Sequence, residues 1–350
     1  MKRTAVVLFN LGGPDSLTSV RPFLFNLFYD PAIIRVPNPM RWLIATAIST
    51  LRSSKARGIY QKMGGKSPIL PQTVSQADAL EKILSAKGNY KVFVSMRYWH
   101  PMSNVVAKKV KAYDPDEIIL LPLYPQYSTT TTGSSFEDWE QACKKEGIDK
   151  PTTSICCYPT DNHFIAAHAR LVKDSYWKAA EDEKPRILFS AHGLPEKVIE
   201  DGDPYQMQVE KTAQAIVQLL AIDDLDYTVC YQSRVGRMKW IGPSTEEEIE
   251  RAGQDKVPVV VVPIAFVSEH SETLVELDID YRKLAEEKQV PAYWRVPALS
   301  SDALFIDALA QLCLNLERSG EVTSSIKGRF CQGMYTQCAC RDNNNLRLAA

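Results

Sequence analysis

A histidine that directly follows an apolar run stands out among the residues that could do chemistry. His192 lies in the sequence Ser190-Ala-His-Gly-Leu-Pro195, where glycine and proline shape a turn after a strand expected at 187–189. Imidazole titrates near neutral pH, so a histidine in such a turn is well placed to accept a proton. A histidine that only satisfies the turn by hydrogen bonding is the alternative.

A row of acids follows the most apolar run of the chain, at 257–262. Glu272 and Glu276 are four residues apart and share one face of the expected helix, where like charges destabilise unless they are solvated or meet cations and protons. Glu269 and His270 precede them. A histidine together with carboxylates can bind Fe(II) or pass protons away from a reaction centre. The alternative is an acidic helix that is simply exposed to solvent.

Two basic and aromatic segments also lie at expected strand ends. One is Arg97-Tyr98-Trp99-His100, and the other, 230–245, contains arginine, lysine and tryptophan near a glycine. Such side chains can hold a flat anionic ligand by ion pairing and stacking, so together they indicate a pocket for an aromatic polyanion. The turn at 10–15 lacks both glycine-rich phosphate-binding patterns, which counts against a dinucleotide enzyme.

Eight short apolar runs, separated by helix-length segments, are expected to form the strands that position these residues. Continuous apolar strands that alternate with helices predict parallel sheets covered on both faces. The runs divide into four and four, so we expect an α/β chain of two similar Rossmann-like domains, each with a four-stranded parallel sheet. Ligands of such folds bind beyond the carboxyl ends of the strands. The runs lie at 5–9, 92–94, 118–121, 153–157, 187–189, 227–231, 257–262 and 293–296.

The expected domains are 1–160 and 161–300, followed by a helix at 301–326 that returns to the first domain and a cysteine-bearing extension at 327–350. Within the first domain, 31–57 contains an apolar stretch around Trp42 with basic residues on both sides. That segment is either a core helix or an interfacial helix that lies on a membrane or on a hydrophobic ligand.

The composition excludes several classes of protein. The 350 residues carry 41 basic and 42 acidic side chains, so the basic excess of a nucleic-acid binder is missing. The apolar start is too short for a signal peptide and no apolar run reaches the roughly 18 residues of a membrane span. We therefore expect a cytoplasmic protein, monomer or homodimer, whose eight cysteines are thiols, metal ligands or buried apolar residues rather than disulfides.

The motifs taken together resemble those of the ferrochelatase family, which inserts ferrous iron into a porphyrin as the last step of haem synthesis. The resemblance implies the class II chelatase fold and Fe2+ as a substrate. In family order, the motifs are Asn10-Leu-Gly-Gly-Pro14, Tyr60-Gln-Lys-Met-Gly-Gly-Lys-Ser-Pro-Ile69, Met96-Arg-Tyr-Trp-His-Pro101, Leu121-Pro-Leu-Tyr-Pro-Gln-Tyr-Ser128, Ser190-Ala-His-Gly-Leu-Pro195, Tyr231-Gln-Ser-Arg-Val-Gly236, Trp240-Ile-Gly-Pro243 and Phe266-Val-Ser-Glu-His-Ser-Glu-Thr-Leu-Val-Glu-Leu-Asp278.

The resemblance also implies roles for individual residues. His192 corresponds to the catalytic histidine and Glu272 to its acidic counterpart, with Glu276 continuing an acidic path. Whether His192 acts as a base or, with Glu272, as an iron ligand stays open. The porphyrin rim and propionates are expected at Tyr60, Ser67, Arg97 and Tyr98, and the macrocycle at Leu11, Trp240 and Phe266.

Protoporphyrin IX is the expected porphyrin, because of the apolar segment at 31–57 and the closeness to the animal motifs. Since some family members dock on a membrane through such a segment, peripheral docking on the inner face of the membrane becomes the preferred interpretation. Coproporphyrin III is the alternative substrate. A chelatase for cobalt or nickel and a haem carrier without turnover are the competing functions.

Three cysteines of the extension, Cys331, Cys338 and Cys340, are closely spaced, as ligands would be. Some ferrochelatases hold a [2Fe–2S] cluster with three ligands from such an extension and one from the body. The spacing here differs from the animal pattern, and Thr129 replaces the animal body ligand. Neighbouring strand residues face opposite ways, so only one of Cys156 and Cys157 is expected to reach the cluster as the fourth ligand. Cys157 is preferred because it lies nearer the exit of the strand. A disordered end with free thiols is the alternative.

Overall fold

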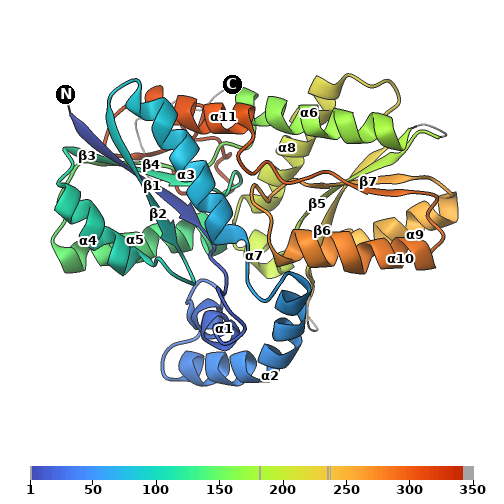
Figure 1. Cartoon of the computed structure of the whole chain (residues 1–350), viewed down its shortest axis with the longest axis horizontal. Helices are drawn as coiled ribbons and strands as arrows, with labels where there is room; N and C mark the ends of the chain where they lie inside the picture. Colours follow the sequence, from blue (N-terminus) through green and yellow to red (C-terminus); the bar gives the residue numbers. More distant parts are fainter. Residues whose placement is uncertain (1, 181–182, 235, 237, 342–350) are drawn as a thin grey trace.

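The protein is described by a computed structural model for residues 2–180, 183–234, 236 and 238–341. Two parallel sheets lie side by side with helices around them (Figure 1). The second sheet has the order β6-β5-β7-β8, with bounds β5 Arg186–His192, β6 Tyr227–Gln232, β7 Val259–Pro263 and β8 Tyr293–Arg295. This confirms the expected α/β fold with two parallel sheets.

The first sheet has five strands, not the expected four. Its order is β2-β1-β3-β4-β9, with bounds β1 Arg3–Asn10, β2 Asn89–Met96, β3 Glu117–Pro122, β4 Thr152–Ile155 and β9 Val322–Thr323. The extra strand comes from the far end of the chain: the Ser154 N–H donates to Glu321 O at 3.0 Å, and the Cys156 N–H donates to Thr323 O at 2.7 Å. A two-residue strand carries too little pattern for the sequence to reveal it.

Side chains of β1, an interior strand of the first sheet, alternate between two cores, as the pleat of a strand requires. Val6 and Leu8 join the large core that includes residues of α3 (Ile69–Ser85), α6 (Asn162–Ala179), α8 (Tyr205–Leu220) and α11 (Ala303–Leu314). Val7 and Phe9 face α4 (Ser103–Tyr113) and α5 (Ser134–Glu146) instead. The large core also contains residues of β5 and β7, so it runs beneath both sheets.

The outer face of the second sheet is covered separately. Leu188 and Val261 pack there against α9 (Thr245–Asp255) and α10 (Tyr281–Glu287). α11 contacts both α3 and α6, and so lies across the two halves of the molecule (Figure 1).

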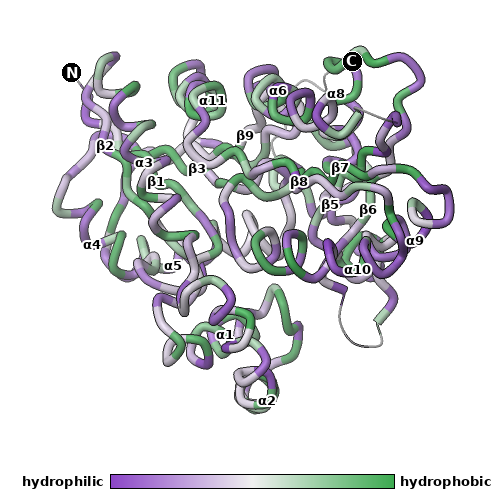
Figure 2. The backbone as a smooth tube through the Cα atoms, turned by 45° about the vertical axis from the view of Figure 1, so that its right-hand side comes forward, coloured by the Kyte–Doolittle hydropathy of each residue, from purple (hydrophilic) through white to green (hydrophobic). Residues whose placement is uncertain are grey.

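Helices α1 (Val20–Tyr29) and α2 (Met40–Lys62) form a pair that projects away from both sheets, as Figures 1 and 2 show from two directions. On α2, the side chains of Met40, Trp42, Leu43 and Leu51 are exposed. In the described residues, no helix has the length and apolar character that a membrane crossing requires. We call α1 and α2 the lip.

Candidate active site

Two residues far apart in the sequence meet at the carboxyl ends of adjacent parallel strands. His192 is the last residue of β5, and Glu272 begins the π-helical segment η2 (Glu272–Asp280), which follows β7. His192 Nδ1 and Glu272 Oε2 are 2.8 Å apart. The imidazole side chain keeps 40% of its surface exposed, so part of the ring stays open to a ligand.

The contact sets the charges of both groups. Burial alone would lower the pKa of His192, but the charge of Glu272 and its hydrogen bond outweigh burial and raise it. Burial would raise the pKa of Glu272, and the neighbouring His192 instead lowers it to about 2. The pair therefore favours an ionised carboxylate beside an imidazole that binds a proton readily.

Glu276 lies one turn further along η2, and its pKa is shifted in the opposite direction from that of Glu272. Its carboxylate accepts hydrogen bonds from the Ser233 N–H at 2.8 Å, the Ser233 hydroxyl at 2.6 Å, Gln232 Nε2 at 3.2 Å and the Tyr281 hydroxyl at 3.1 Å. Burial and the charge of Glu272 nevertheless raise the pKa of Glu276. Two carboxyl groups whose pKa values are pushed apart can divide acid and base roles between them.

A second histidine, His270, belongs to this site. Its Nδ1 accepts the Glu272 N–H at 2.9 Å, and its ring packs edge-on against Phe266 with centroids 4.6 Å apart. Burial lowers the pKa of His270, so it favours a neutral ring. The sequence analysis placed His270 beside the acids as part of a possible metal or proton-relay site, but it assigned His270 no contact with Glu272 or Phe266.

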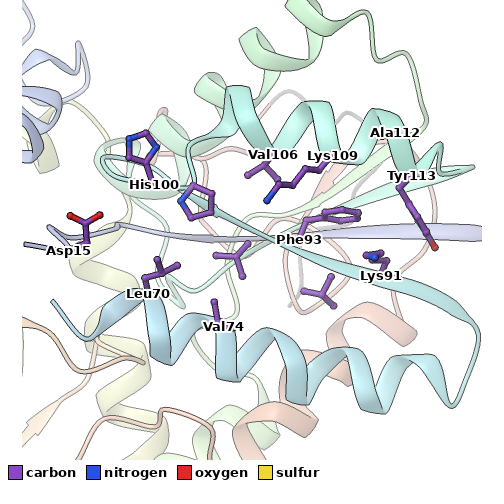
Figure 3. A pocket seen from close by; sticks show the side chains of 13 residues that line it. Asp15, Leu70, Val74, Lys91, Phe93, His100, Val106, Lys109, Ala112 and Tyr113 are labelled. Carbon is purple, nitrogen blue, oxygen red and sulfur yellow. The ribbon is translucent and has the colours of Figure 1, made fainter. Parts of the chain in front are cut away.

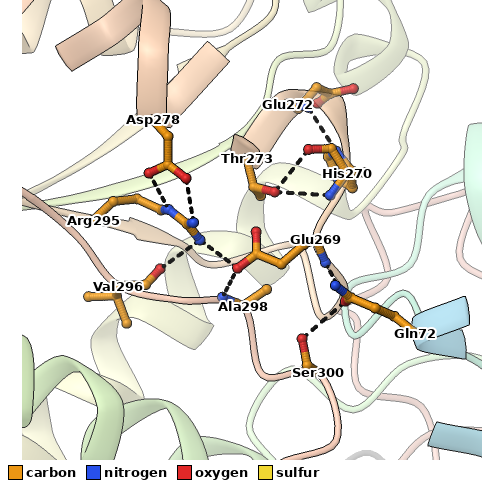
Figure 4. A network of polar contacts seen from close by, with 10 residues as sticks. All are labelled: Gln72, Glu269, His270, Glu272, Thr273, Asp278, Arg295, Val296, Ala298 and Ser300. Atoms are coloured by element: carbon orange, nitrogen blue, oxygen red, sulfur yellow. Dashed lines mark hydrogen bonds and ion pairs between the residues drawn. The ribbon is translucent and has the colours of Figure 1, made fainter. Parts of the chain in front are cut away.

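An arginine at the end of β8 neutralises the flanking acids (Figure 4). Arg295 pairs with Glu269 at 2.6 Å and with both carboxylate oxygens of Asp278 at 2.8 and 2.6 Å. Gln72 of α3 accepts the Glu269 N–H at 2.7 Å. Arg295 thus ties Glu269, before η2, to Asp278, near the end of η2. The sequence analysis identified neither Arg295 nor Gln72.

Trp240 lies beside the turn that follows His192, and Phe266 packs against His270. Trp240 pairs with the Pro195 backbone, and its ring lies 3.5 Å from where a Cβ on Gly193 would be. The indole N–H of Trp240 is buried and has no hydrogen-bond partner among the residues that the structure describes. A Cβ on Gly193 would lie 3.0 Å from Gln232 O, so glycine at this position allows the turn after His192 to pack closely against the end of β6.

Tyr60 of α2 connects the lip to the residues around Glu272. Burial raises the pKa of Tyr60 to about 12, with a hydrogen bond to Ser271 and the charge of Glu272 also acting on the hydroxyl. Leu11 and Tyr60 belong to one apolar cluster under the lip. The Ser67 N–H donates to Pro14 O at 2.8 Å, which places Ser67 against the turn after β1.

Arg97 and Tyr98 direct their polar atoms at the base of the lip. Arg97 Nη2 is 2.9 Å from Asp30 Oδ2, Arg97 Nε donates to Ser134 Oγ at 2.6 Å, and the Tyr98 hydroxyl donates to Asp30 at 2.7 Å. Asp30 is buried and follows α1. These residues therefore anchor α1 in the described structure.

A groove of about 890 Å³ lies away from these groups, on the open edge of the first sheet. Figure 3 shows its walls, with Leu70 and Val74 on α3 and Val106 and Lys109 on α4. Neither His192 nor Glu272 lines it. The groove is therefore separate from the candidate active site.

Five cysteines form a second buried group, which we call the thiol cluster: Cys156, Cys157, Cys331, Cys338 and Cys340. Cys156 Sγ is 3.5 Å from Cys157 Sγ and 3.4 Å from Cys340 Sγ. Both body cysteines reach the group because β4 ends at Ile155, before the alternation of strand side chains would separate them. The last part of the predicted extension, 342–350, lies outside the described residues.

In the described part of the chain, no three His, Cys, Asp or Glu side chains are arranged to hold a single metal ion. A [2Fe–2S] cluster has a different requirement, since four thiolates share two irons and three ligands need not surround one point. The five buried thiols, which are contributed by both the body and the extension, fit that requirement as a donor set.

Comparison with known proteins gives one consistent result. A family model described as ferrochelatase matches residues 3–316 and so ends before Cys331. A ferrochelatase of Wolbachia sp. subsp. Drosophila simulans (strain wRi) is 55% identical over 316 residues, which cover 90% of this chain and 99% of that protein. A ferrochelatase of Caulobacter vibrioides (strain NA1000 / CB15N) is 51% identical and covers 97% of this chain and 98% of its own length.

Among solved structures, SirB from Bacillus subtilis with Fe3+ has a TM-score of 0.53 at 13% identity, and the match covers 89% of this chain and 94% of that chain. At that identity the likeness concerns the fold alone.

Proposed function

Because this chain belongs to the ferrochelatase family, a family of metal chelatases that join ferrous iron to a porphyrin, we propose that it inserts Fe2+ into protoporphyrin IX. The product is protohaem and two protons are released. The observation that carries the proposal is the 2.8 Å contact between His192 and Glu272 at the ends of two neighbouring strands.

The reaction requires a distorted ring and a proton acceptor. A free-base porphyrin is planar and carries two inward-pointing N–H groups, so a metal ion enters only when the ring buckles and both protons leave. Walls that bind the bent ring better than the flat one favour the shape of the transition state. Trp240, beside the turn that follows His192, and Phe266, against His270, are the proposed walls.

We assign His192 the role of first proton acceptor. Its Nδ1 faces the Glu272 carboxylate, so the favoured neutral tautomer carries its proton on Nδ1 and donates it to Glu272. Nε2 then keeps its lone pair and accepts a proton from a pyrrole N–H. Glu272 stabilises the imidazolium that forms, because its own pKa is lowered and it stays ionised.

Glu276 is the proposed next site for a proton. Its raised pKa means that it takes up a proton more readily than Glu272 does, and it lies one turn away on the same segment. This favours the base role for His192 over the alternative, in which His192 and Glu272 hold the incoming iron.

We divide the remaining residues that were predicted to bind the porphyrin into two groups. Leu11 of the turn after β1, Tyr60 of the lip and Ser67 lie where the lip meets that turn, and there Leu11 can contact the macrocycle while Tyr60 and Ser67 contact the porphyrin rim. Arg97 and Tyr98 are better assigned to holding the lip through Asp30, because their polar atoms are already paired with it.

The lip is the proposed membrane contact, with the protein in the cytoplasm and peripheral on the inner face of the membrane. Trp42, Leu43 and Leu51 are exposed apolar side chains on α2, and Leu51 is 81% exposed. Arg52, Lys55 and Arg57 of the same helix can contact anionic headgroups.

A [2Fe–2S] cluster is the proposed cofactor, with Cys157, Cys331, Cys338 and Cys340 as its ligands. When bound, it would supply a one-electron redox centre. All four thiols are buried and come from segments that the chain must bring together by folding. Visible absorption of an iron–sulfur centre in anaerobically purified protein tests this assignment, and its absence with full iron supply contradicts it.

The catalytic proposal is tested by incubating the protein with ferrous iron and either protoporphyrin IX or coproporphyrin III under reducing, oxygen-free conditions. We expect repeated turnover with protoporphyrin and a larger kcat/KM than with coproporphyrin. Larger kcat/KM with coproporphyrin supports the alternative substrate. Binding of one porphyrin per chain without turnover indicates a carrier.

A further inference from the structure

A completely buried amide side chain lies beside the thiol cluster. Gln208, on the first turn of α8, has no exposed surface. A buried primary amide must satisfy one acceptor and two donor hydrogens within the protein. The partners of Gln208 are therefore informative.

The orientation of the amide is fixed by a backbone contact. Gln208 Oε1 accepts the Tyr127 N–H at 2.8 Å. The amino group must then face the other way, and it does so toward sulfur: Nε2 is 3.1 Å from Cys331 Sγ and 3.5 Å from Cys157 Sγ. One amide thus provides a donor hydrogen for each of two sulfurs.

The two sulfurs come from different parts of the chain. Cys157 follows β4 in the body and Cys331 belongs to the extension, 174 positions later by subtraction of the two residue numbers. A cysteine that binds iron carries negative charge on its sulfur, and an N–H group aimed at that sulfur stabilises this charge, so the two donors suit Cys157 and Cys331 as cluster ligands. Cys156, by contrast, contacts Cys157 and Cys340.

We propose that Gln208 is a positioning residue that holds the sulfurs of Cys157 and Cys331 next to each other and thereby selects Cys157 as the body ligand. The inference rests on the cluster assigned under the proposed function. Its two N–H···S bonds withdraw charge from the bound thiolates, which makes the oxidised cluster easier to reduce.

The selection of Cys157 is tested by iron content. We expect Cys157→Ser to lose the visible absorption and the cluster iron, and Cys156→Ser to keep both. The reverse result, with iron retained in Cys157→Ser and lost in Cys156→Ser, overturns the selection.

The effect on the cluster is tested by redox titration followed by visible absorption and electron paramagnetic resonance. Gln208→Met removes both donors at similar length. Gln208→Glu keeps an acceptor for the Tyr127 N–H and also removes both donors. Gln218→Met, on the exposed side of the same helix, is the matched control.

In both Gln208 variants we expect reduction to become about tenfold less favourable, a shift of about 59 mV to more negative potential for a one-electron couple. The Gln218 variant should match the native protein. A native cluster whose potential is unchanged in both Gln208 variants overturns the inference alone. If the native protein carries no cluster, the cofactor assignment fails and the inference fails with it.

If Gln208→Met does not fold, as judged by circular dichroism, the Gln208→Glu titration decides. Loss of the cluster from a folded Gln208 variant supports the inference.

Discussion

Acid should destabilise the protein through a histidine that takes no part in the chemistry. His168 of α6 is 1% exposed, and its ring packs edge-on against Phe164 with centroids 4.8 Å apart. Neither ring nitrogen has a hydrogen-bond partner in the described structure. Burial lowers the pKa of His168 to about 3.

The sign and size of the effect follow from proton binding. Between the lowered pKa and the ordinary value of 6.5, the unfolded chain binds a proton at His168 and the folded chain does not. Stability is therefore fully present above about pH 6.5 and falls as the pH drops. At about pH 5 the contribution lost is about 2 kcal/mol, because one pKa unit corresponds to about 1.36 kcal/mol.

The assay is urea unfolding of the native protein and of His168→Leu at about pH 8 and about pH 5. We expect the stability of the variant relative to the native protein to rise by about 2 kcal/mol between these conditions. Groups such as the His192–Glu272 pair titrate in both proteins, so their effects cancel in this difference. His163→Leu, at an exposed position of the same helix, is the control. An equal difference at both pH values would refute the reasoning.

Three further predictions concern the active site and the lip. His192→Ala should lower kcat roughly 10²- to 10⁴-fold while porphyrin binding, followed by fluorescence, persists; near-normal turnover removes the histidine from the mechanism. Glu272→Gln should lower the pKa of His192 and reduce turnover with little change in porphyrin affinity, because the charge that raises that pKa is gone. If only porphyrin binding is lost, Glu272 is a substrate contact. Leu43→Asp with Ile44→Asp should release the protein from liposomes containing anionic lipid, and Leu219→Asp, an exposed site on α8, should not. Unchanged partition of the double variant in flotation assays contradicts lip docking.

The sequence predicted the features that depend on local pattern. Apolar runs fixed the parallel strands, and a polar residue directly after a run, such as His192, marked the edge where Glu272 would meet it. Neighbouring strands of one parallel sheet bring their carboxyl ends to the same edge, but the pairing of His192 with Glu272 in particular was expected only from the resemblance to ferrochelatases.

Features that depend on distant contacts were missed. Nothing local indicates that Arg97 is held by Asp30, since the pairing requires α1 to fold against the end of β2. Arg295 ends a three-residue strand, and its role follows only from the acids that surround it. The alternation argument for the cysteine pair was wrong for a simpler reason, because β4 stops at Ile155 and the expected strand ran to 157.

The short strand β9 has a consequence for any shortened form of this enzyme. Carbonyl groups of β9 and of the residue before it accept hydrogen bonds from the N–H groups of Ser154 and Cys156. Without these bonds β4 would be an unpaired edge strand of the first sheet. An edge of that kind is a template on which another polypeptide can add a strand. Cutting the chain before residue 321 to study the catalytic body by itself should therefore yield a product that self-associates, even though none of the proposed porphyrin contacts has been removed.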